Sequence, residues 1–465
     1  MTHPRTRRIG AARAGRPARR ILVVLGAASV LLAAACAPGG SAPDAAGTGG
    51  EISTEVPADE QITLTMTHFE NGGLGESIDR LIAEYEELNP NVSIEARYTS
   101  FVDYGRSIRL TMSSDSAPDI AQVGQAYVMM GPLVEAGVLA PLDDYASAYG
   151  WDDRFQEGLL AQSRFQEDGL AFGDGSLYGV ALGGNMVGIF YNKALVEQLG
   201  LEVPFATLAD FEEALGTAQA AGLAPLALGN IEGWPAGHIA SSLMSQYQTG
   251  SEVLDWIYGR DGATFDTPAT VEALTTMKRW ADTGFISSAA NGTSLSDAET
   301  SFLSGESLFL YAGNWSAALV DEGLGADAGF MLVPPAEANA PKRATGATTS
   351  PFGISTTSEH PDVAANFLDF MVSETSIPVL LEGGYAPVVP GGLTAGTDIG
   401  GTRSAFNDAF AEVLADDGLT LYLDWATVTM NDTLFPALQQ LIGGQSTPED
   451  VIGTVQADWA AARNP

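Results

Sequence analysis

The chain has 465 residues, with 58 Asp and Glu against 21 Lys and Arg and a formal charge of −37. A surface this acidic repels nucleic acid and anionic lipid headgroups, so we expect no nucleic-acid partner. The length exceeds one compact core, which predicts two lobes, and a single cysteine excludes an internal disulfide and, alone, a structural zinc site.

The N-terminal segment is typical of a secretion signal. Residues 1–20 carry seven arginines and no acid, and residues 21–35 are apolar or small, too few to span a bilayer. Three alanines precede Cys36, and the pattern resembles a bacterial lipobox, although Ala33 stands where leucine is usual. The resemblance implies a lipoprotein signal peptide over 1–35 and a lipid-modified, palmitate-bearing Cys36. An ordinary signal peptide cut after Ala35 is the alternative, and the secretion route, general or twin-arginine, is left open.

Residues 36–60 predict a flexible tether, because they are mostly Gly, Ala, Pro, Ser and acids and offer almost nothing to bury. Without the leader, 14 Lys and Arg remain against 58 acids, a formal charge of −44. No second apolar run reaches transmembrane length. We therefore expect a protein anchored to the cell membrane by lipid, on the extracytoplasmic face.

The folded part begins with a strand–helix–strand pattern. Residues 62–69 alternate apolar and polar side chains, as a half-buried strand does. Residues 75–90 place apolar side chains at helical spacing and end at Asn89-Pro90, and residues 92–99 alternate again. Two strands joined by a helix predict a parallel βαβ unit.

Strand and helix patterns continue to alternate along the chain, which predicts an α/β fold. Further helices are expected around 104–112, from the N-cap Thr207 to residue 223, and over 360–373. Further strands are expected at 118–124, 178–182, 187–191 and 224–229.

Five segments in order give the chain a family resemblance. They are RLIAEYEELNPNVSIE (80–95), SAPDIAQVGQAYVMMGPLVEAGVLAPLDDY (116–145), LYGVALGGNMVGIFYNKAL (177–195), SFLSGESLFLYAGNWSAAL (301–319) and TGATTSPFGISTTSEHPDVAANFLDFM (345–371). Through them residues 61–465 resemble the extracellular solute-binding proteins of ABC importers, in the sugar-binding cluster (family 1) that includes maltose-binding protein.

The resemblance implies a two-lobed periplasmic-binding-protein fold (type II), with a ligand cleft between lobes joined by hinge crossings. Lobe 1 is expected at 61–185 plus 350–397, and lobe 2 at 186–349 plus 398–465. The implied function is capture of a sugar or oligosaccharide outside the membrane and its delivery to the transmembrane subunits of an ABC permease. A monomer without cofactor or metal is expected.

Candidate ligand-binding residues follow the predicted strands, where open α/β sheets bind ligands. Polar side chains and one aromatic follow the first strand, amides follow the third, and another amide lies at the first crossing between the lobes. These candidates are His68, Phe69, Glu70, Asn71, Gln122, Gln125 and Asn185.

Trp315 is the principal single candidate, because the family places an aromatic there to stack on a sugar ring. A pyranose has an apolar C–H face and a polar rim, so a flat indole with amides and carboxyls beside it matches both. The remaining candidates are Trp234, Asn314, Phe352, Tyr385, Asp424 and Trp425.

Two other functions stay open. The same fold could bind a polyamine, a peptide or another polar solute, and an acidic chain mildly favours a cation. Among the candidates, however, the amides of Asn71, Gln122, Gln125, Asn185 and Asn314 outnumber the acids, which favours a neutral polyol. A surface glycoside hydrolase would need paired carboxylates, and no pair stands out; no nucleophile, zinc or phosphate-loop motif occurs, so we expect no enzyme.

Overall fold

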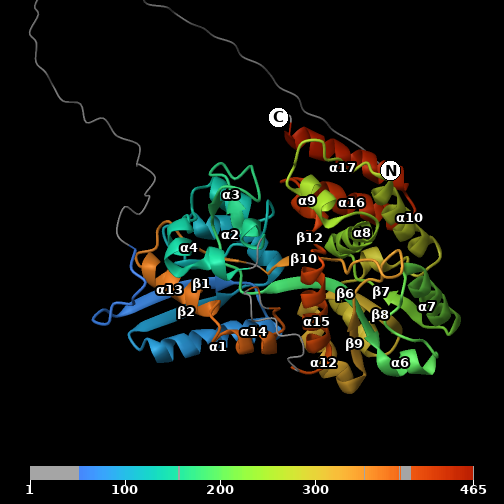
Figure 1. Cartoon of the computed structure of the whole chain (residues 1–465), viewed down its shortest axis with the longest axis horizontal. Helices are drawn as coiled ribbons and strands as arrows, with labels where there is room; N and C mark the ends of the chain where they lie inside the picture. Colours follow the sequence, from blue (N-terminus) through green and yellow to red (C-terminus); the bar gives the residue numbers. More distant parts are fainter. Residues whose placement is uncertain (1–51, 156–157, 350, 387, 389–398, 464–465) are drawn as a thin grey trace, which may run out of the picture. The chain divides into compact units, whose positions relative to one another are not determined.

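The computed structural model describes residues 52–155, 158–349, 351–386, 388 and 399–463. The predicted signal peptide, Cys36 and the tether as far as residue 51 lie outside the described residues. Residues 50–465 form one compact unit, and its elements are labelled in Figure 1. Among the described residues, no helix has the length and apolar character needed to cross a membrane.

The first sheet has the strand order β11-β3-β1-β2. Its strands are β1 (Ile62–His68), β2 (Val92–Tyr98), β3 (Ile120–Gln122) and β11 (Phe352–Ile354). β1 pairs in parallel with β2 and β3, which confirms the predicted βαβ unit, and β11 is antiparallel to β3. Strands β1 and β3 therefore end at the same edge of the sheet, which places residues 68–71 beside residues 122–125.

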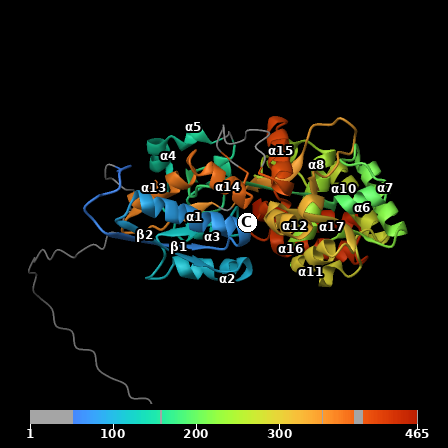
Figure 2. The same cartoon turned by 90° about the horizontal axis from the view of Figure 1, so that it is seen from below.

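Helices cover both faces of this sheet, as Figure 2 shows for α1 (Gly72–Leu88) and α2 (Phe101–Met112). Leu64 and Met66 of β1 share a core with Ile78 of α1, whereas Ala121 of β3 shares another with Ile108 of α2. The other elements of this lobe are α3 (Met130–Glu135), α4 (Asp143–Tyr149), α5 (Trp151–Arg154), η1 (Leu160–Ser163), β4 (Arg164–Phe165), β5 (Ser176–Leu177), α13 (Pro361–Met371) and α14 (Ile377–Gly383).

The second sheet has the order β12-β10-β6-β8-β7, with β9 also paired to β6. Its strands are β6 (Gly184–Asn192), β7 (Ala224–Ala227), β8 (Ser307–Gly313), β9 (Ala328–Met331), β10 (Ala344–Thr348) and β12 (Leu419–Thr420). The predicted N-cap is confirmed, since Thr207 forms a capping box with Asp210 at the start of α7. The predicted strand at 178–182 is wrong: only an isolated bridge at Val180 occurs there.

Helices enclose the second sheet as well. Ile189 and Phe309 pack with Ile239 of α8, and Phe190 and Leu310 pack with helices that include α12 and α15. The elements are α6 (Lys193–Gln198), α7 (Leu208–Ala220), α8 (Trp234–Tyr247), α9 (Gly250–Ile257), α10 (Pro268–Asp282), η2 (Ala290–Gly292), α11 (Leu295–Leu303), η3 (Asn314–Ser316), α12 (Ala317–Leu324), η4 (Gly325–Asp327), α15 (Gly401–Ala415), η5 (Leu423–Trp425), α16 (Met430–Ile442) and α17 (Pro448–Arg463).

The end of the predicted tether packs on the first lobe. Ser53 N–H donates to Asp362 Oδ2 at 3.1 Å, and Asn366 Nδ2 donates to the Thr54 carbonyl at 2.9 Å. Ile52 and Val56 also contact the apolar core of this lobe. The predicted tether boundary at residue 60 is therefore too late, because these residues have partners to bond and bury.

Candidate functional site

A hydrogen-bonded network joins the ends of β1 and β3. The Phe69 N–H donates to Gln122 Oε1 at 2.9 Å, and Gln122 Nε2 donates to Glu70 Oε1 at 2.7 Å. Burial raises the pKa of Glu70 to about 7, although the hydrogen bond from Gln122 opposes the shift. The buried Gln122 thus holds Glu70 in place while both ends of its own amide are occupied.

Neighbouring candidates play different parts. The Phe69 ring packs edge-on against Phe101 and Tyr104, with centroids 5.1 and 5.2 Å away. His68 is buried with Nδ1 lacking a partner, and burial lowers its pKa. Asn71 is exposed at the N-cap of α1, where its side chain makes no capping bond.

A direct contact links this region to the second lobe. Asn314 Nδ2, at the start of η3, donates to the Gly384 carbonyl at 2.8 Å. The next residue, Tyr385, is 2% exposed and its hydroxyl has no partner. Burial, together with the Glu70 carboxyl, raises the pKa of Tyr385, so Tyr385 lies near Glu70. The Tyr385 side chain is therefore buried, and its hydroxyl is available to a donor or acceptor of a bound solute.

Four rings of the second lobe form what we call the aromatic group: Trp234, His238, Trp315 and Tyr422. The Trp234 and Trp315 rings meet edge to face with centroids 5.9 Å apart. His238 lies 4.9 Å from Trp234, 5.9 Å from Trp315 and 4.4 Å from Tyr422. Burial lowers the pKa of His238 to about 3, so this ring is neutral at physiological pH.

The backbone before Trp315 holds its indole in place. A Cβ at Gly313 would overlap the six-membered ring of Trp315, so the ring lies directly against this glycine. Ser316 Oγ donates to the buried Glu299 at 2.6 Å, which fixes the far end of η3. Contacts on both sides of Trp315 in η3 therefore fix the position of its indole.

Two predicted amides hold the crossings between the lobes. Asn185 Oδ1 accepts from the Ala347 N–H at 3.1 Å and from the Tyr422 hydroxyl at 2.9 Å. Gln125 Nε2 donates to the Thr348 carbonyl at 2.7 Å, from the first lobe to β10 of the second. Asn185 thus connects the crossings to Tyr422 of the aromatic group, and Gln125 connects the two lobes.

Two aromatic candidates are buried in this structure. Phe352 is fully buried in the core of the first lobe, where the alternation of β11 turns its side chain inward. Trp425 is 4% exposed and packs between Tyr422 and Phe172, with centroids 5.4 and 6.1 Å away. Its neighbour Asp424 is 8% exposed with Oδ1 unpartnered, and burial raises its pKa to about 7.

Unpartnered polar atoms gather among the predicted residues. Native structures pair nearly all buried polar groups, so each exception calls for an explanation such as a bound solute. Of the described side chains with such atoms, five are candidates from the sequence: His68 Nδ1, Asn314 Oδ1, Trp315 Nε1, Tyr385 OH and Asp424 Oδ1. Both donors and acceptors are among them.

Sequence reasoning missed His238, Tyr422 and Phe172. Trp234 and His238 are four residues apart at the start of α8, so they share a helix face, and this spacing could have found His238. Tyr422 lies two residues before the predicted Asp424. Phe172 belongs to the β4–β5 hairpin of the first lobe yet contacts Tyr258 and Trp425 of the second, and no local pattern indicates such a contact.

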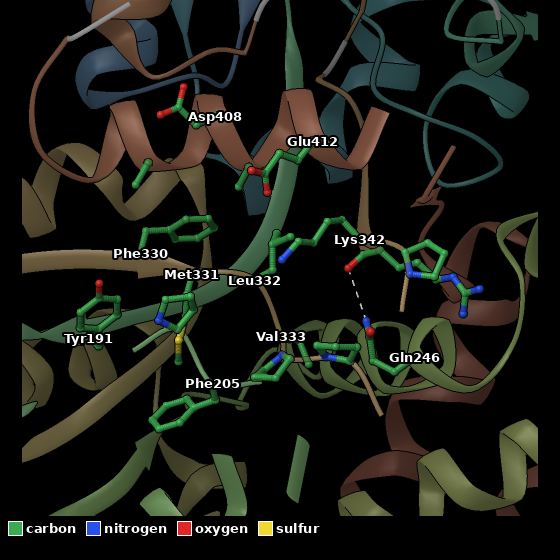
Figure 3. A pocket seen from close by; sticks show the side chains of 17 residues that line it. Tyr191, Phe205, Gln246, Phe330, Met331, Leu332, Val333, Lys342, Asp408 and Glu412 are labelled. Atoms are coloured by element: carbon green, nitrogen blue, oxygen red, sulfur yellow. Dashed lines mark hydrogen bonds between the residues drawn. The ribbon is translucent and has the colours of Figure 1, made fainter. Parts of the chain in front are cut away.

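A separate cavity of about 220 Å³ lies in the second lobe, and none of the predicted site residues lines it. Its walls come from Tyr191, Phe205, the segment 330–335 and α15, and Figure 3 shows Lys342 beside them. Within the part of the chain that the structure describes, no group of three His, Cys, Asp or Glu could hold a metal ion.

Comparison with protein families gives a match over most of the chain. The family model described as "Bacterial extracellular solute-binding protein" matches residues 71–376. The multiple sugar-binding protein of Streptococcus mutans serotype c is 22% identical over 257 residues. That alignment covers 54% of this chain and 58% of the relative, so the chain spans little more than half the length of the relative it matches.

Solved structures share the fold across both lobes. A chitin oligosaccharide binding protein superposes with a TM-score of 0.69 at 20% identity, covering 86% of this chain and 99% of that one. The GacH receptor of Streptomyces glaucescens, solved unliganded and with acarbose, gives 0.68 at 18% identity, covering 86% and 98%. The likeness confirms the predicted two-lobed α/β fold.

Proposed function

Because the chain belongs to the bacterial extracellular solute-binding protein family, we propose that it captures a sugar or oligosaccharide and delivers it to an ABC permease. Relatives with sugar in their names or bound in their structures support this ligand class, among them the Streptococcus mutans protein and RafE in complex with raffinose. The family is one of binding proteins rather than enzymes.

The observation that carries the proposal is the aromatic group with free polar atoms around it. Trp234 and Trp315 offer flat apolar surfaces to the C–H face of a pyranose. Trp315 Nε1 and Asn314 Oδ1 are unpartnered, as is the hydroxyl of Tyr385, which follows the Gly384 bonded by Asn314; these atoms can bond the hydroxyls of the ring edge. A ligand there would touch both lobes, because Tyr385 belongs to the first and Trp315 to the second.

Binding then favours the closed arrangement of the lobes. Solute that bonds both lobes at once stabilises only the conformation in which they meet, and it shifts the population toward closure. A micromolar affinity requires about −8 kcal/mol, which stacked aromatics and several hydrogen bonds in a desolvated site can supply. The permease would recognise the closed form.

The cellular setting is part of the same proposal. A lipid on Cys36 holds the monomer at the outer face of the cell membrane, and the segment up to residue 51 spaces the lobes from it. The two lobes of the proposal are residues 61–185 plus 350–397, with the segment from residue 52 packed on them, and residues 186–349 plus 398–465. The division of strands between the two sheets supports these boundaries.

A thermal-shift screen of residues 52–465 tests the ligand class. Mono-, di- and trisaccharides are compared with polyamines and short peptides, since a solute that binds only the folded state raises the melting temperature. A shift with saccharides is expected. A shift with polyamines or peptides alone would overturn the proposal, and turnover of chromogenic glycosides by the same protein would favour a hydrolase.

A further inference from the structure

Of the five amides that favour a neutral solute on sequence grounds, four already form at least one hydrogen bond within the protein, and the fifth, Asn71, is exposed. Both ends of the Gln122 amide are bonded, to the Phe69 N–H and Glu70. Gln125 Nε2 bonds Thr348, and Asn185 Oδ1 accepts two hydrogen bonds. Of the buried amides at the site, Asn314 alone presents an unpartnered atom, its carbonyl oxygen, which is an acceptor.

Carboxyl oxygens are prominent among the acceptors that remain. Asp424 is more than nine-tenths buried with Oδ1 unpartnered. Glu70 uses Oε1 to accept from Gln122, which leaves the rest of its carboxyl for another donor. A solute that satisfies Asp424, Glu70 and Asn314 must therefore bring hydrogen-bond donors.

The described part of the chain supplies no positive side chain to these acids. Among the described residues, no Lys or Arg forms an ion pair with Glu70 or Asp424. His238 is neutral because of its burial. A buried carboxylate without a cation is unfavourable, so a positive charge on the solute would be strongly stabilised here.

The rings beside Asp424 suit a cation as well. Burial raises the pKa of the Tyr422 hydroxyl, and the nearby Asp424 carboxyl adds to this shift. Tyr422 contacts His238, which contacts both tryptophans. An ammonium group is attracted to the faces of Trp and Tyr as well as to a carboxylate. A neutral hydroxyl group is attracted less strongly than an ammonium group to an aromatic face or to a carboxylate.

We infer that the solute is an amino sugar, with a protonated amine held by the Asp424 carboxyl beside the aromatic group. The inference rests on the proposed function, because it takes the sugar site as given and names the substituent that the site selects. Glu70 bonds a second donor of the same molecule.

Calorimetric titration of residues 52–465 with stereochemically matched sugars tests the inference. The probes are glucosamine, N-acetylglucosamine and glucose, the same three forms of galactose, and the matching β-1,4-linked disaccharides of the glucose series. At pH 7.5 the free amine should bind at least tenfold tighter than its N-acetylated and hydroxyl counterparts. Equal or tighter binding of the neutral forms would overturn the inference and leave the proposed function standing. If no saccharide of either kind binds, the proposed function falls, and the inference with it.

The variant Asp424→Asn should reduce the preference for the amine over its neutral counterparts from at least tenfold to less than threefold. Asp458→Asn is the matched control, since Asp458 accepts from three threonine hydroxyls outside the site and should leave the preference intact. Retained preference in folded Asp424→Asn would contradict the assignment of Asp424.

The pH dependence of the wild-type protein serves if the variant does not fold. Burial raises the pKa values of Asp424 and Glu70 to about 7, so both carboxyls gain protons between pH 7.5 and 5.5. The titratable groups near them are Tyr422, Tyr311 and His238 around Asp424, and Tyr385 and His68 around Glu70. Affinity for the amine should fall about tenfold over this range. A flat profile would overturn the inference.

Discussion

Trp234, at the first position of α8, and Trp315, in the short helix after β8, meet at an interplanar angle of 80°. The Trp315→Ala variant should bind sugar more than tenfold more weakly with its fold intact, because the stacking surface and the unpartnered Nε1 are lost together. Calorimetry measures the affinity, and circular dichroism checks the fold.

Trp256→Phe is the control, because Trp256 is buried in the second lobe against Phe265 and Trp459. It should lower stability and leave affinity unchanged. An unchanged affinity in Trp315→Ala would rule out the stacking role.

The Trp315 ring lies directly against the backbone of Gly313, where a side chain would not fit. Gly313→Ala should weaken sugar binding at least fivefold, because the new methyl group overlaps the Trp315 ring and displaces it. Gly292→Ala is the matched control, since a Cβ there meets nothing within 4 Å. Equal affinities for the two variants, measured by calorimetry, would show that sugar binding does not depend on the position of the Trp315 indole.

The β4–β5 hairpin should stabilise the closed arrangement of the two lobes without contacting the solute. Phe172 lies 5.2 Å from Tyr258 and 6.1 Å from Trp425, both across the lobe boundary. Phe172→Ala should weaken sugar binding about tenfold by destabilising the closed form, and the ligand-free radius of gyration should rise in small-angle scattering. Leu170→Ala in the same hairpin is the control, because Leu170 is 65% exposed. Identical scattering of the two variants would contradict this role.

Ionisation of the buried Asp424 should destabilise the ligand-free protein at high pH. Burial raises its folded pKa from 3.8 to about 7, so the folded state holds the proton more tightly than the unfolded chain. Its contribution to stability is present below pH 4 and is lost as the pH rises through 7. Asp424→Asn should therefore be more stable than wild type at pH 8, by on the order of 2–4 kcal/mol in urea unfolding. The difference should shrink toward pH 4; a constant difference would show that ionisation is not the cause.

Cys36→Ser tests the anchor separately from the site. The full-length variant should leave the membrane fraction and appear in the medium, because no lipid can be attached. Sugar binding by the purified protein should equal that of wild type. Loss of affinity in this variant would show that Cys36 does more than attach the chain to the membrane.

Much of the fold could be predicted from the sequence because its signals are local. The alternation of Ile62, Leu64 and Met66 and the helical spacing of Ile78, Leu81 and Ile82 fix the first βαβ unit. The strand expected at 178–182 fails because its pattern suits a buried extended segment equally well, and only Val180 finds a bridge partner.

The site could be predicted less fully, because its chemistry depends on partners distant in sequence. Asn314 and Trp315 are candidates only through the family resemblance of segment 301–319, and the structure places them directly after β8. The sequence does not show that Gln122 donates its amide hydrogen bond to Glu70, or that Phe352 points into the core. Both depend on the register of the sheet, which the composition of these segments does not encode. The free groups of the site emerge only after these contacts are known.

A crystal structure of residues 52–465 with the tightest-binding saccharide of the screen tests the central claim most directly. A sugar ring should stack on Trp315, with Asn314 and Tyr385 within hydrogen-bond distance and both lobes in contact with the ligand. A saccharide bound elsewhere, for example in the cavity lined by Tyr191 and Phe205, with Trp315 untouched, would contradict the account.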